Sequence, residues 1–364
     1  MSAERAGRRV TRADVARVAG TSTAVVSYVV NNGPRPVAPA TRERVLAAIE
    51  QVGYVPDTIA KALASGATGT YGLIVPDIAN PFFAALAHAV DEATSAVGKV
   101  VLLGDSAESK QRESELIDTF MRRRIDGLLF VGVDNSPALG TLTGNGVPVV
   151  ILDRDARTAD RDDPAAPVSA AVSMSVSIDN VGAARVVTEH LLGHGYTRVG
   201  ITAGPAGLDP ARDRLAGWHD ALTAAGLDPD PRWVVEAPFS RRGGLDAGRA
   251  LFARAGADRP EAVFASNEQQ AIGLLVAADE AGLRVPADVA VISFDGTEAS
   301  EYCVPRLSGV VQPLGAMART AVELLGRAAG AAEPVPAAHV LSDYELRIRP
   351  SCGPHDGAVA QPFP

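Results

Sequence analysis

Polar side chains that bind hydroxyl groups recur where apolar, strand-like runs of this sequence end. Asp105, Asp153 and Asp295 each follow such a run, and Asn267 follows another in the string FASNEQ. Carboxylates and amides accept and donate hydrogen bonds to vicinal hydroxyls, and a guanidinium can bridge two of them. Each residue alone also suits a helix cap or a surface charge, so both roles stay open. The candidate ligand-binding residues are Asn80, Phe82, Phe83, Asp105, Asp153, Arg154, Arg214, Asn267, Phe294, Asp295 and Gln312.

Aromatic rings accompany these polar groups. Phe82 and Phe83 follow Asn80-Pro81, and we expect one ring in the core and the other against the apolar face of a sugar. Phe294 can supply a second stacking face. Together the polar and aromatic positions favour a carbohydrate ligand, and a nucleobase or other metabolite is the alternative.

No arrangement of residues indicates catalysis or a bound cofactor. The sequence has no Ser/His/Asp arrangement, no Walker loop and no G-x-G-x-x-G turn. Cys303 and Cys352 are too few for a disulfide framework, and no Cys/His cluster has metal-ligand spacing. We therefore expect no enzyme activity, no cofactor and no metal. The histidines expected to lie scattered on helix surfaces are His88, His190, His194 and His219.

The elements that would position the candidate residues alternate between strand and helix from residue 71 onward. This alternation predicts the α/β class, with parallel sheets covered on both faces. Two such sets in series predict two lobes, and the turns after their strands face a cleft where open α/β sheets bind ligands. The expected strands are 71–75, 99–103, 127–131, 148–152, 198–202, 233–236, 262–265 and 289–294. The expected helices include 82–97, 181–192, 211–225, 244–255 and 268–281.

A different pattern occupies residues 10–32, VTRADVARVAGTSTAVVSYVVNN. Apolar residues recur at helical spacing in two short segments, Gly20 separates the segments, and Ser22 can cap the second. Two small helices packed in this way leave the first turn and outer face of the second free, which suits a DNA major groove. Any two amphipathic helices joined at a glycine share the pattern, so DNA binding needs further support. The expected core positions are Val15, Ala16, Ala19, Val26, Val29 and Val30.

Charge is divided unevenly along the chain of 364 residues. The net charge is −9, yet residues 1–70 hold nine Lys or Arg against five acids, a net charge of +4, and the remainder carries −13. A small basic segment on a large acidic body favours phosphate contact at one end. A third helix, expected from about Pro39 to Gly53, carries Arg42 and Arg44. Their ordinary role is a solvated surface, but beside a groove-bound helix they would contact phosphate.

The remaining segments set the expected boundaries and location. No apolar run reaches the roughly 18 residues that a membrane span needs, and the basic N-terminus has no apolar segment after it. We therefore expect a cytoplasmic protein. Residues 1–9 and 351–364 are expected to be disordered, and 154–173, rich in Ala, Pro and Asp, to form a surface loop.

Taken together, these segments resemble the LacI-type (lactose-repressor-type) transcriptional regulators. The resemblance covers residues 10–350 and is carried by ADVARVAG–TSTAVVSYVVNN, TRERVLAAIEQVGYVPD, KALASG and GLIVPDIANPFF, in that order. It implies a helix-turn-helix headpiece in 10–56, a hinge helix in 57–70 and a core like periplasmic sugar-binding proteins in 71–350. The first lobe is expected at 71–178 and 312–330, and the second at 179–311 and 331–350. The resemblance also implies a repressor that forms homodimers on near-palindromic double-stranded operators and responds to a small effector.

The resemblance assigns roles in DNA binding. Thr23, Ala24 and Tyr28 fall where this family reads base edges. Arginine is common at the position of Tyr28 and pairs bidentately with guanine, whereas tyrosine offers one hydroxyl and a ring, which leaves the operator sequence open. Leu63 falls where paired hinge helices wedge into the minor groove, and Lys61 can add a backbone contact. The positions that fall on phosphate contacts are Thr11, Ser22, Ser27, Asn31 and Arg42.

The sequence does not decide which ligand binds, but it disfavours two other functions. We expect a sugar between the lobes, with a pentose-sized sugar as one specific possibility, and a nucleobase or other metabolite acting as corepressor is the alternative. A sugar-binding transport protein without DNA function would not need the basic first 70 residues. An enzyme acting on a sugar would need a catalytic motif that the sequence does not contain.

Overall fold

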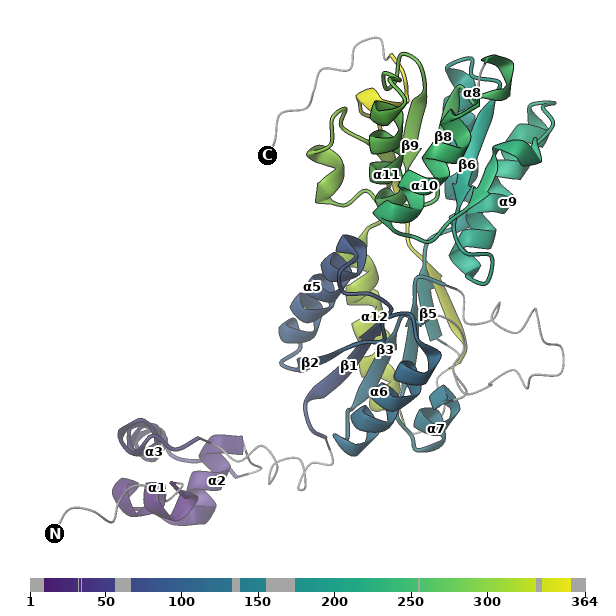
Figure 1. Cartoon of the computed structure of the whole chain (residues 1–364). Helices are drawn as coiled ribbons and strands as arrows, with labels where there is room; N and C mark the ends of the chain where they lie inside the picture. Colours follow the sequence, from purple (N-terminus) through teal and green to yellow (C-terminus); the bar gives the residue numbers. More distant parts are fainter. Residues whose placement is uncertain are drawn as a thin grey trace. The chain divides into compact units, whose positions relative to one another are not determined.

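The computed structural model describes residues 10–31, 33, 35–55, 67–132, 138–154, 174–254, 256–331 and 336–354. It divides into two compact units, Met1–Thr68 and Gly69–Pro364, which we call the head and the sensor and describe separately (Figure 1). The expected arm, hinge and surface loop lie wholly or largely outside the described residues. The expectation of a disordered tail from residue 351 is wrong for residues 351–354, because Ser351 and Cys352 are buried in the short helix Pro350–Cys352, and residues 355–364 lie outside the described residues. None of the described helices combines the length and apolar character that crossing a bilayer requires.

Three helices form the head: α1 (Arg12–Ala19), α2 (Thr23–Asn31) and α3 (Pro39–Val52). Gly20 and Gly53 end α1 and α3 with φ angles of 61° and 64°, which glycine adopts without a Cβ penalty. Apolar residues at helical spacing converge on one small core and leave the opposite helix faces in solvent. This core consists of Val15, Ala16, Ala19, Val26, Val29, Val45, Ala48 and Tyr54.

The first sheet of the sensor is parallel and has the strand order β11-β5-β4-β3-β1-β2. Alternate residues of β1 face opposite sides of this sheet, as the pleat requires. Leu73 clusters with Leu86 of α5 and Met317 of α12, whereas Ile74 clusters with Ile117 of α6. The strands are β1 (Thr70–Val75), β2 (Val100–Asp105), β3 (Gly127–Phe130), β4 (Val149–Leu152), β5 (Met174–Ser177) and β11 (Ala338–Leu341). The helices are α5 (Pro81–Ala96), α6 (Lys110–Arg122), α7 (Ala138–Gly144) and α12 (Leu314–Ala329).

The second sheet has the order β12-β10-β9-β8-β6-β7, and only its edge strand β12 runs antiparallel to its neighbour among the described pairs. Two glycines let two of its helices, α10 and α11, approach closely. A Cβ on Gly244 would lie 2.1 Å from the carbonyl oxygen of Gln270, and Gly273 is equally confined. The strands are β6 (Val199–Ala203), β7 (Val234–Glu236), β8 (Ala262–Ala265), β9 (Ala290–Ser293), β10 (Ser308–Val311) and β12 (Glu345–Arg347). The helices are α8 (Asn180–Gly193), α9 (Asp209–Ala224), α10 (Arg241–Phe252) and α11 (Glu268–Glu280).

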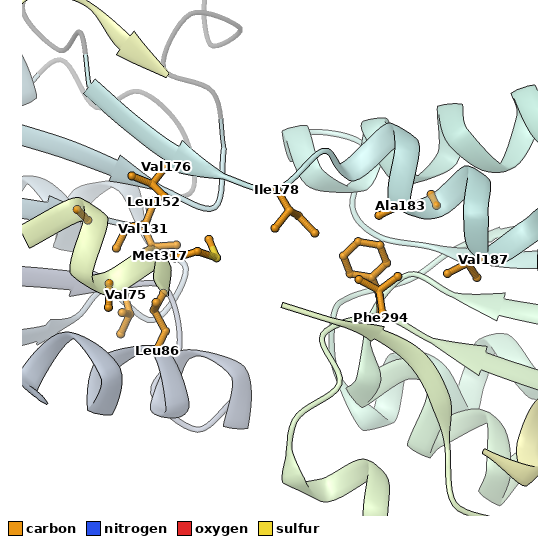
Figure 2. Packing of buried hydrophobic residues seen from close by; sticks show 14 of the residues in the cluster. Val75, Leu86, Val131, Leu152, Val176, Ile178, Ala183, Val187, Phe294 and Met317 are labelled. Atoms are coloured by element: carbon orange, nitrogen blue, oxygen red, sulfur yellow. The ribbon is translucent and has the colours of Figure 1, made fainter. Parts of the chain in front are cut away.

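The described chain passes between the two lobes after β5, after β10 and after β11. Ile178, on the first of these crossings, belongs to a core cluster that includes residues of both lobes, and Figure 2 shows it between Met317 and Phe294. The eight expected strands are present with bounds within two residues, but β5, β10, β11 and β12 were not expected.

One expected boundary is wrong. β11 pairs in register with β5, so it belongs to the first sheet and not to the second lobe, where residues 331–350 were expected. Only β12 joins the second sheet. The Nδ1 atom of His339 lies 2.8 Å from the Oγ atom of Ser175, a contact 164 residues apart in sequence that local patterns do not reveal.

Candidate functional site

A cavity of about 360 Å³ opens in the sensor at the carboxyl ends of the strands of both sheets. Its volume lies within the range of small-molecule sites, and its position is the one where open α/β sheets bind ligands. From the first lobe it is lined by Pro76, Asn80, Phe82, Phe83, Glu108, Lys110, Val131, Gly132, Leu152, Asp153 and Arg154. From the second lobe it is lined by Pro205, Gly207, Leu208, Asp209, Pro210, Arg214, Phe239, Asn267 and Asp295.

Arg214, from α9, is a buried cation in the wall of this cavity. Its Nε donates to Oδ1 of Asn180 at 2.9 Å, and its Nη1 donates to the carbonyl oxygen of Ser266 at 2.7 Å. Its Cζ lies 3.8 Å from the ring centroid of Phe294. Nη1 also lies 3.8 Å from Oδ1 of Asp295. These contacts fix the plane of the guanidinium, so a donor group is held in place before any ligand binds.

Asp295 follows β9 with a φ of 89°, a conformation that is costly for a residue other than glycine. Burial raises the pKa of its carboxyl to about 7, against the lowering effect of Arg214. The neighbouring Asp153 and Glu268 raise this pKa further. Nε2 of Gln312 donates to Oδ1 of Asp295 at 3.0 Å and stabilises the ionised form. Asp295 therefore changes its charge near neutral pH.

Asp153 forms a second strained carboxyl in the cavity wall. It follows β4 with a φ of 70°. Burial raises its pKa to about 6, while Arg214 and Arg154 lower it. Its Oδ1 is buried and has no hydrogen-bond partner among the described residues. A hydroxyl group of a bound ligand would satisfy this acceptor.

Asn80 and Asn267 act as helix caps and also line the cavity. Oδ1 of Asn80 accepts from the backbone N–H of Phe82 at 3.1 Å at the start of α5. Oδ1 of Asn267 accepts from the backbone N–H of Gln270 at 2.9 Å at the start of α11. The two roles left open by the sequence are therefore compatible, since capping occupies Oδ1 and leaves the two N–H groups of Nδ2, of which Asn267 directs one to the carbonyl oxygen of Phe239 at 3.4 Å.

The cavity brings together eight of the candidate residues and omits three. Asp105 is not part of the wall and instead accepts from the backbone N–H of Ala107 at 3.0 Å. Phe294 is fully buried beneath Arg214, and Gln312 is buried against Asp295, so both act through the residues that they contact. The eight that line the cavity are Asn80, Phe82, Phe83, Asp153, Arg154, Arg214, Asn267 and Asp295.

The sequence analysis missed Phe239, Glu108, Lys110 and Asp209 in the cavity wall. Phe239 follows β7, a three-residue edge strand, and its ring centroid lies 5.9 Å from Cζ of Arg214. Glu108 and Lys110 follow β2, whose last residue is Asp105, and Asp209 begins α9. The strand-end rule that selected Asp105 would have found Glu108 and Lys110 if applied a few residues further along the chain.

The raised pKa values predict how the stability of the sensor depends on pH. A carboxyl with a raised pKa holds its proton in the folded state where the unfolded chain has released it, so its contribution to stability falls as pH rises. We expect this fall from about pH 4 to about pH 6 for Asp153 and to about pH 7 for Asp295, at most about 1.4 kcal/mol per pH unit for each group. Urea unfolding at a series of pH values should give a shallower fall for Asp295→Asn. Identical slopes for the variant and the wild type would contradict the assignment.

In the head, the first turn of α2 lies exposed as expected. Thr23 and Ala24 are exposed, and the hydroxyl of Ser22 accepts from the backbone N–H of Val25 at 3.3 Å. Tyr28 is half-buried because its ring lies against Gly33, where a Cβ would approach Cδ1 of the ring to 2.6 Å. Small exposed side chains beside a positioned aromatic ring form a surface that can approach the edges of bases.

The residues expected to contact phosphate lie before α1, at the start of and along α2, and on α3. The hydroxyl of Thr11 donates to Oδ2 of Asp14 at 2.7 Å, and Nδ2 of Asn31 donates to Oγ of Ser27 at 3.2 Å. Arg42 is exposed on α3. Lys61 and Leu63 lie outside the described residues.

Comparisons with known families match the head and part of the sensor separately. Residues 11–57 match the family described as bacterial regulatory proteins, lacI family. Residues 188–352 match the family described as periplasmic binding protein-like domain. The first match covers the three helices of the head. The second match covers most of the second lobe, together with α12 and β11 of the first lobe.

Relatives match along most of their length. The HTH-type transcriptional repressor PurR of Photobacterium profundum is 31% identical over 86% of this chain and 90% of its own. Catabolite control protein A of Priestia megaterium is 32% identical over 87% and 91%, and the ribose operon repressor of Escherichia coli is 31% identical over 86% and 92%. The lac repressor dimer bound to operator and the anti-inducer ONPF matches with a TM-score of 0.81 and 26% identity over 95% of this chain and all of that one. The transcriptional regulator CelR in complex with cellobiose gives a TM-score of 0.68 and 31% identity over 94% of this chain and all of that one.

Proposed function

Because the chain belongs to the LacI family of bacterial regulatory proteins, we propose that a small ligand in the sensor cavity controls the affinity of the head for operator DNA. The chain is a DNA-binding transcriptional regulator of the repressor type, with a helix-turn-helix head and two parallel-sheet lobes. The single observation that carries the cavity assignment is the buried guanidinium of Arg214 beside the strained carboxyls of Asp153 and Asp295. An arrangement this costly in desolvation and strain is typical of a binding site.

A carbohydrate fits these groups best. The carboxylates of Asp153 and Asp295 accept hydrogen bonds from hydroxyls, and Arg214 donates to them. Phe83 and Phe239 in the wall offer apolar faces for a sugar ring. The CelR structure is a complex with cellobiose, which supports a sugar as the ligand of this chain. We infer a sugar effector, with a pentose-sized ring as the specific candidate.

A panel of ligands tests this assignment. Thermal unfolding of the protein with pentoses, hexoses, disaccharides and purines, each at the same concentration, should show stabilisation by a sugar. A ligand at 100 times its Kd stabilises the folded state by about 2.7 kcal/mol, which gives a clear rise in Tm. Stabilisation by a purine and by none of the sugars would replace the sugar by the nucleobase alternative.

Binding to DNA is expected to involve two copies of the head. The lac repressor dimer in its complex with operator supports a homodimer of this chain on a near-palindromic site. The base-reading residues would be Thr23, Ala24 and Tyr28 on the exposed turn of α2. A duplex that the protein selects from a random-sequence library, called here the selected operator, supplies the probe. The affinity of the protein for the selected operator should fall steeply as the salt concentration rises, because phosphate contacts release counterions. The phosphate contacts would be made by Thr11, Ser22, Ser27, Asn31 and Arg42.

The hinge segment supplies a further prediction. Leu63→Ala should weaken binding to the selected operator about tenfold or more. An apolar wedge unstacks a base step and bends the duplex, and the bent duplex contacts more protein surface, which offsets the cost of unstacking. Sugar binding by the sensor should be unchanged. Fluorescence anisotropy with the labelled operator measures the first effect, and thermal shift measures the second. Equal operator affinity for variant and wild type would remove Leu63 from the interface, and Lys61→Ala should have the smaller effect of a single phosphate contact.

A regulator that binds operator DNA needs access to the chromosome, so we propose that this protein is cytoplasmic. We also propose that it has no catalytic activity. The relatives are transcriptional regulators. Incubating the protein with the sugar that stabilises it should return the sugar unchanged. Conversion of that sugar would instead support an enzyme.

A further inference from the structure

Two histidines and a cysteine converge in the second lobe, away from the cavity. His190 lies in the last turn of α8, His194 caps the helix end, and Cys352 lies in the short helix Pro350–Cys352. Nε2 of His190 lies 3.3 Å from Nε2 of His194 and 3.2 Å from Sγ of Cys352. The three ligand atoms all lie within 4.8 Å of one another. The expectation that these histidines lie scattered on helix surfaces is therefore wrong for His190 and His194.

From this geometry we propose that His190, His194 and Cys352 bind a zinc ion. In a tetrahedral site with Zn–N near 2.05 Å and Zn–S near 2.3 Å, two nitrogens lie about 3.3 Å apart, and nitrogen and sulfur about 3.6 Å apart. The separations of 3.3 Å between the two nitrogens and 3.2 Å between nitrogen and sulfur lie within about 0.4 Å of these values, so side-chain shifts that bring the three atoms together would complete the site. Two imidazoles and a thiolate are ligands that select zinc over harder cations such as magnesium or calcium. Coordination releases the thiol proton to solvent.

The surroundings of the three side chains suit a bound cation. The site lies at the carboxyl end of α8, where the helix dipole favours positive charge. Cys352 is fully buried, whereas both histidines are half-exposed, so an ion can enter from the histidine side. The backbone also confines His194, because a Cβ on Gly353 would lie 3.0 Å from its Nδ1.

The segment that carries Cys352 is itself fixed to the second sheet. The hydroxyl of Ser351 donates to the carbonyl oxygen of Val291 at 2.7 Å and accepts from the backbone N–H of Ser308 at 2.9 Å. The hydroxyl of Ser308 lies 3.0 Å from Sγ of Cys352. Because one ligand is held by β9 and β10 and the other two by one helix, a zinc ion would join α8 to the sheet and raise the stability of the second lobe.

Zinc titration of the full-length chain tests this site, with the metal-free protein prepared by chelation. We expect one zinc ion per chain, a rise in Tm on zinc addition, and at least tenfold weaker binding for His190→Gln, His194→Gln and Cys352→Ser. Cobalt in place of zinc should give thiolate-to-metal absorption that Cys352→Ser abolishes. The matched controls are Cys303→Ser, on a half-buried cysteine, and His219→Gln, on an exposed histidine, and both should bind zinc as the wild type does.

The alternative is a hydrogen-bonded cluster that holds no metal. Equal zinc affinity for the wild type and for His194→Gln, or cobalt absorption that survives loss of Cys352, would overturn the proposal. Should Cys352→Ser fail to fold, His194→Gln still decides, because its side chain is half-exposed. The Tm of each variant in the presence of chelator shows whether the metal-free variant still folds, and so separates loss of zinc binding from loss of the fold.

Discussion

Replacing Asp295 with alanine is expected to abolish the control of operator binding by the effector. Asp295 is a buried acceptor beside Arg214, and its strained backbone holds it at the cavity. Hydrogen bonds to a charged group contribute about 1.5–3 kcal/mol, so effector affinity should fall about 10- to 150-fold. At an effector concentration near the Kd of the wild type, the variant should bind the selected operator almost as the ligand-free protein does.

Operator anisotropy with and without the stabilising sugar measures this loss of response. Folding of the variant should survive, since Arg214 keeps its bonds to Asn180 and to the carbonyl oxygen of Ser266. Asp279→Ala is the matched control, because Asp279 is an exposed aspartate on α11. A variant that still responds at the wild-type effector concentration would remove Asp295 from the site.

Replacing Thr23 and Tyr28 together by alanine should remove most of the sequence-specific affinity of the head. A bidentate base contact contributes about 1–3 kcal/mol, and a single hydroxyl lies at the low end of that range, so loss of the pair should cost about 2 kcal/mol, roughly 30-fold, in affinity for the selected operator. Phosphate contacts are retained, so binding to random duplex should change little. The ratio of the two affinities, measured at one salt concentration, reports the loss of specificity.

The control for this pair lies on the sensor. Tyr302 is 66% exposed, and Tyr302→Ala removes a tyrosine without altering the head. It should keep full specificity. The core of the head does not include Thr23 or Tyr28, so the double variant should keep the helical content of the head. Unchanged specificity in the double variant would mean that the recognition surface lies elsewhere.

Local patterns were enough to predict the head. Gly20 and Gly53 end their helices with positive φ, and Val26 and Val29 lie in the core on the face that their spacing indicates. Each of these signals is complete within about four residues, and a helix contains its own hydrogen bonds. The helix bounds therefore follow from the sequence without knowledge of the tertiary fold.

Long-range pairing could not be predicted in the same way. In the sequence, β11 is a short stretch with no signal for its partner strand. Its place beside β5 depends on pairing between residues 164 positions apart. His190 and His194 are visible as an i, i+4 pair on one helix, yet only the fold brings Cys352 to them. Asp105 lies at the end of a strand, as Asp153 does, but its Oδ1 accepts a local hydrogen bond from the backbone N–H of Ala107. Position along a strand predicts which residues can reach a cleft, whereas packing decides which do.

The central claim is that occupancy of the sensor cavity sets the operator affinity of the head. Anisotropy of the labelled selected operator, titrated with protein at fixed salt with and without the sugar that raises Tm, tests it most directly. A coupling of 1–3 kcal/mol predicts an operator affinity that changes about 5- to 150-fold in the wild type and does not change in Asp295→Ala. A sugar that saturates the cavity but leaves the operator affinity of the wild type unchanged would contradict the account.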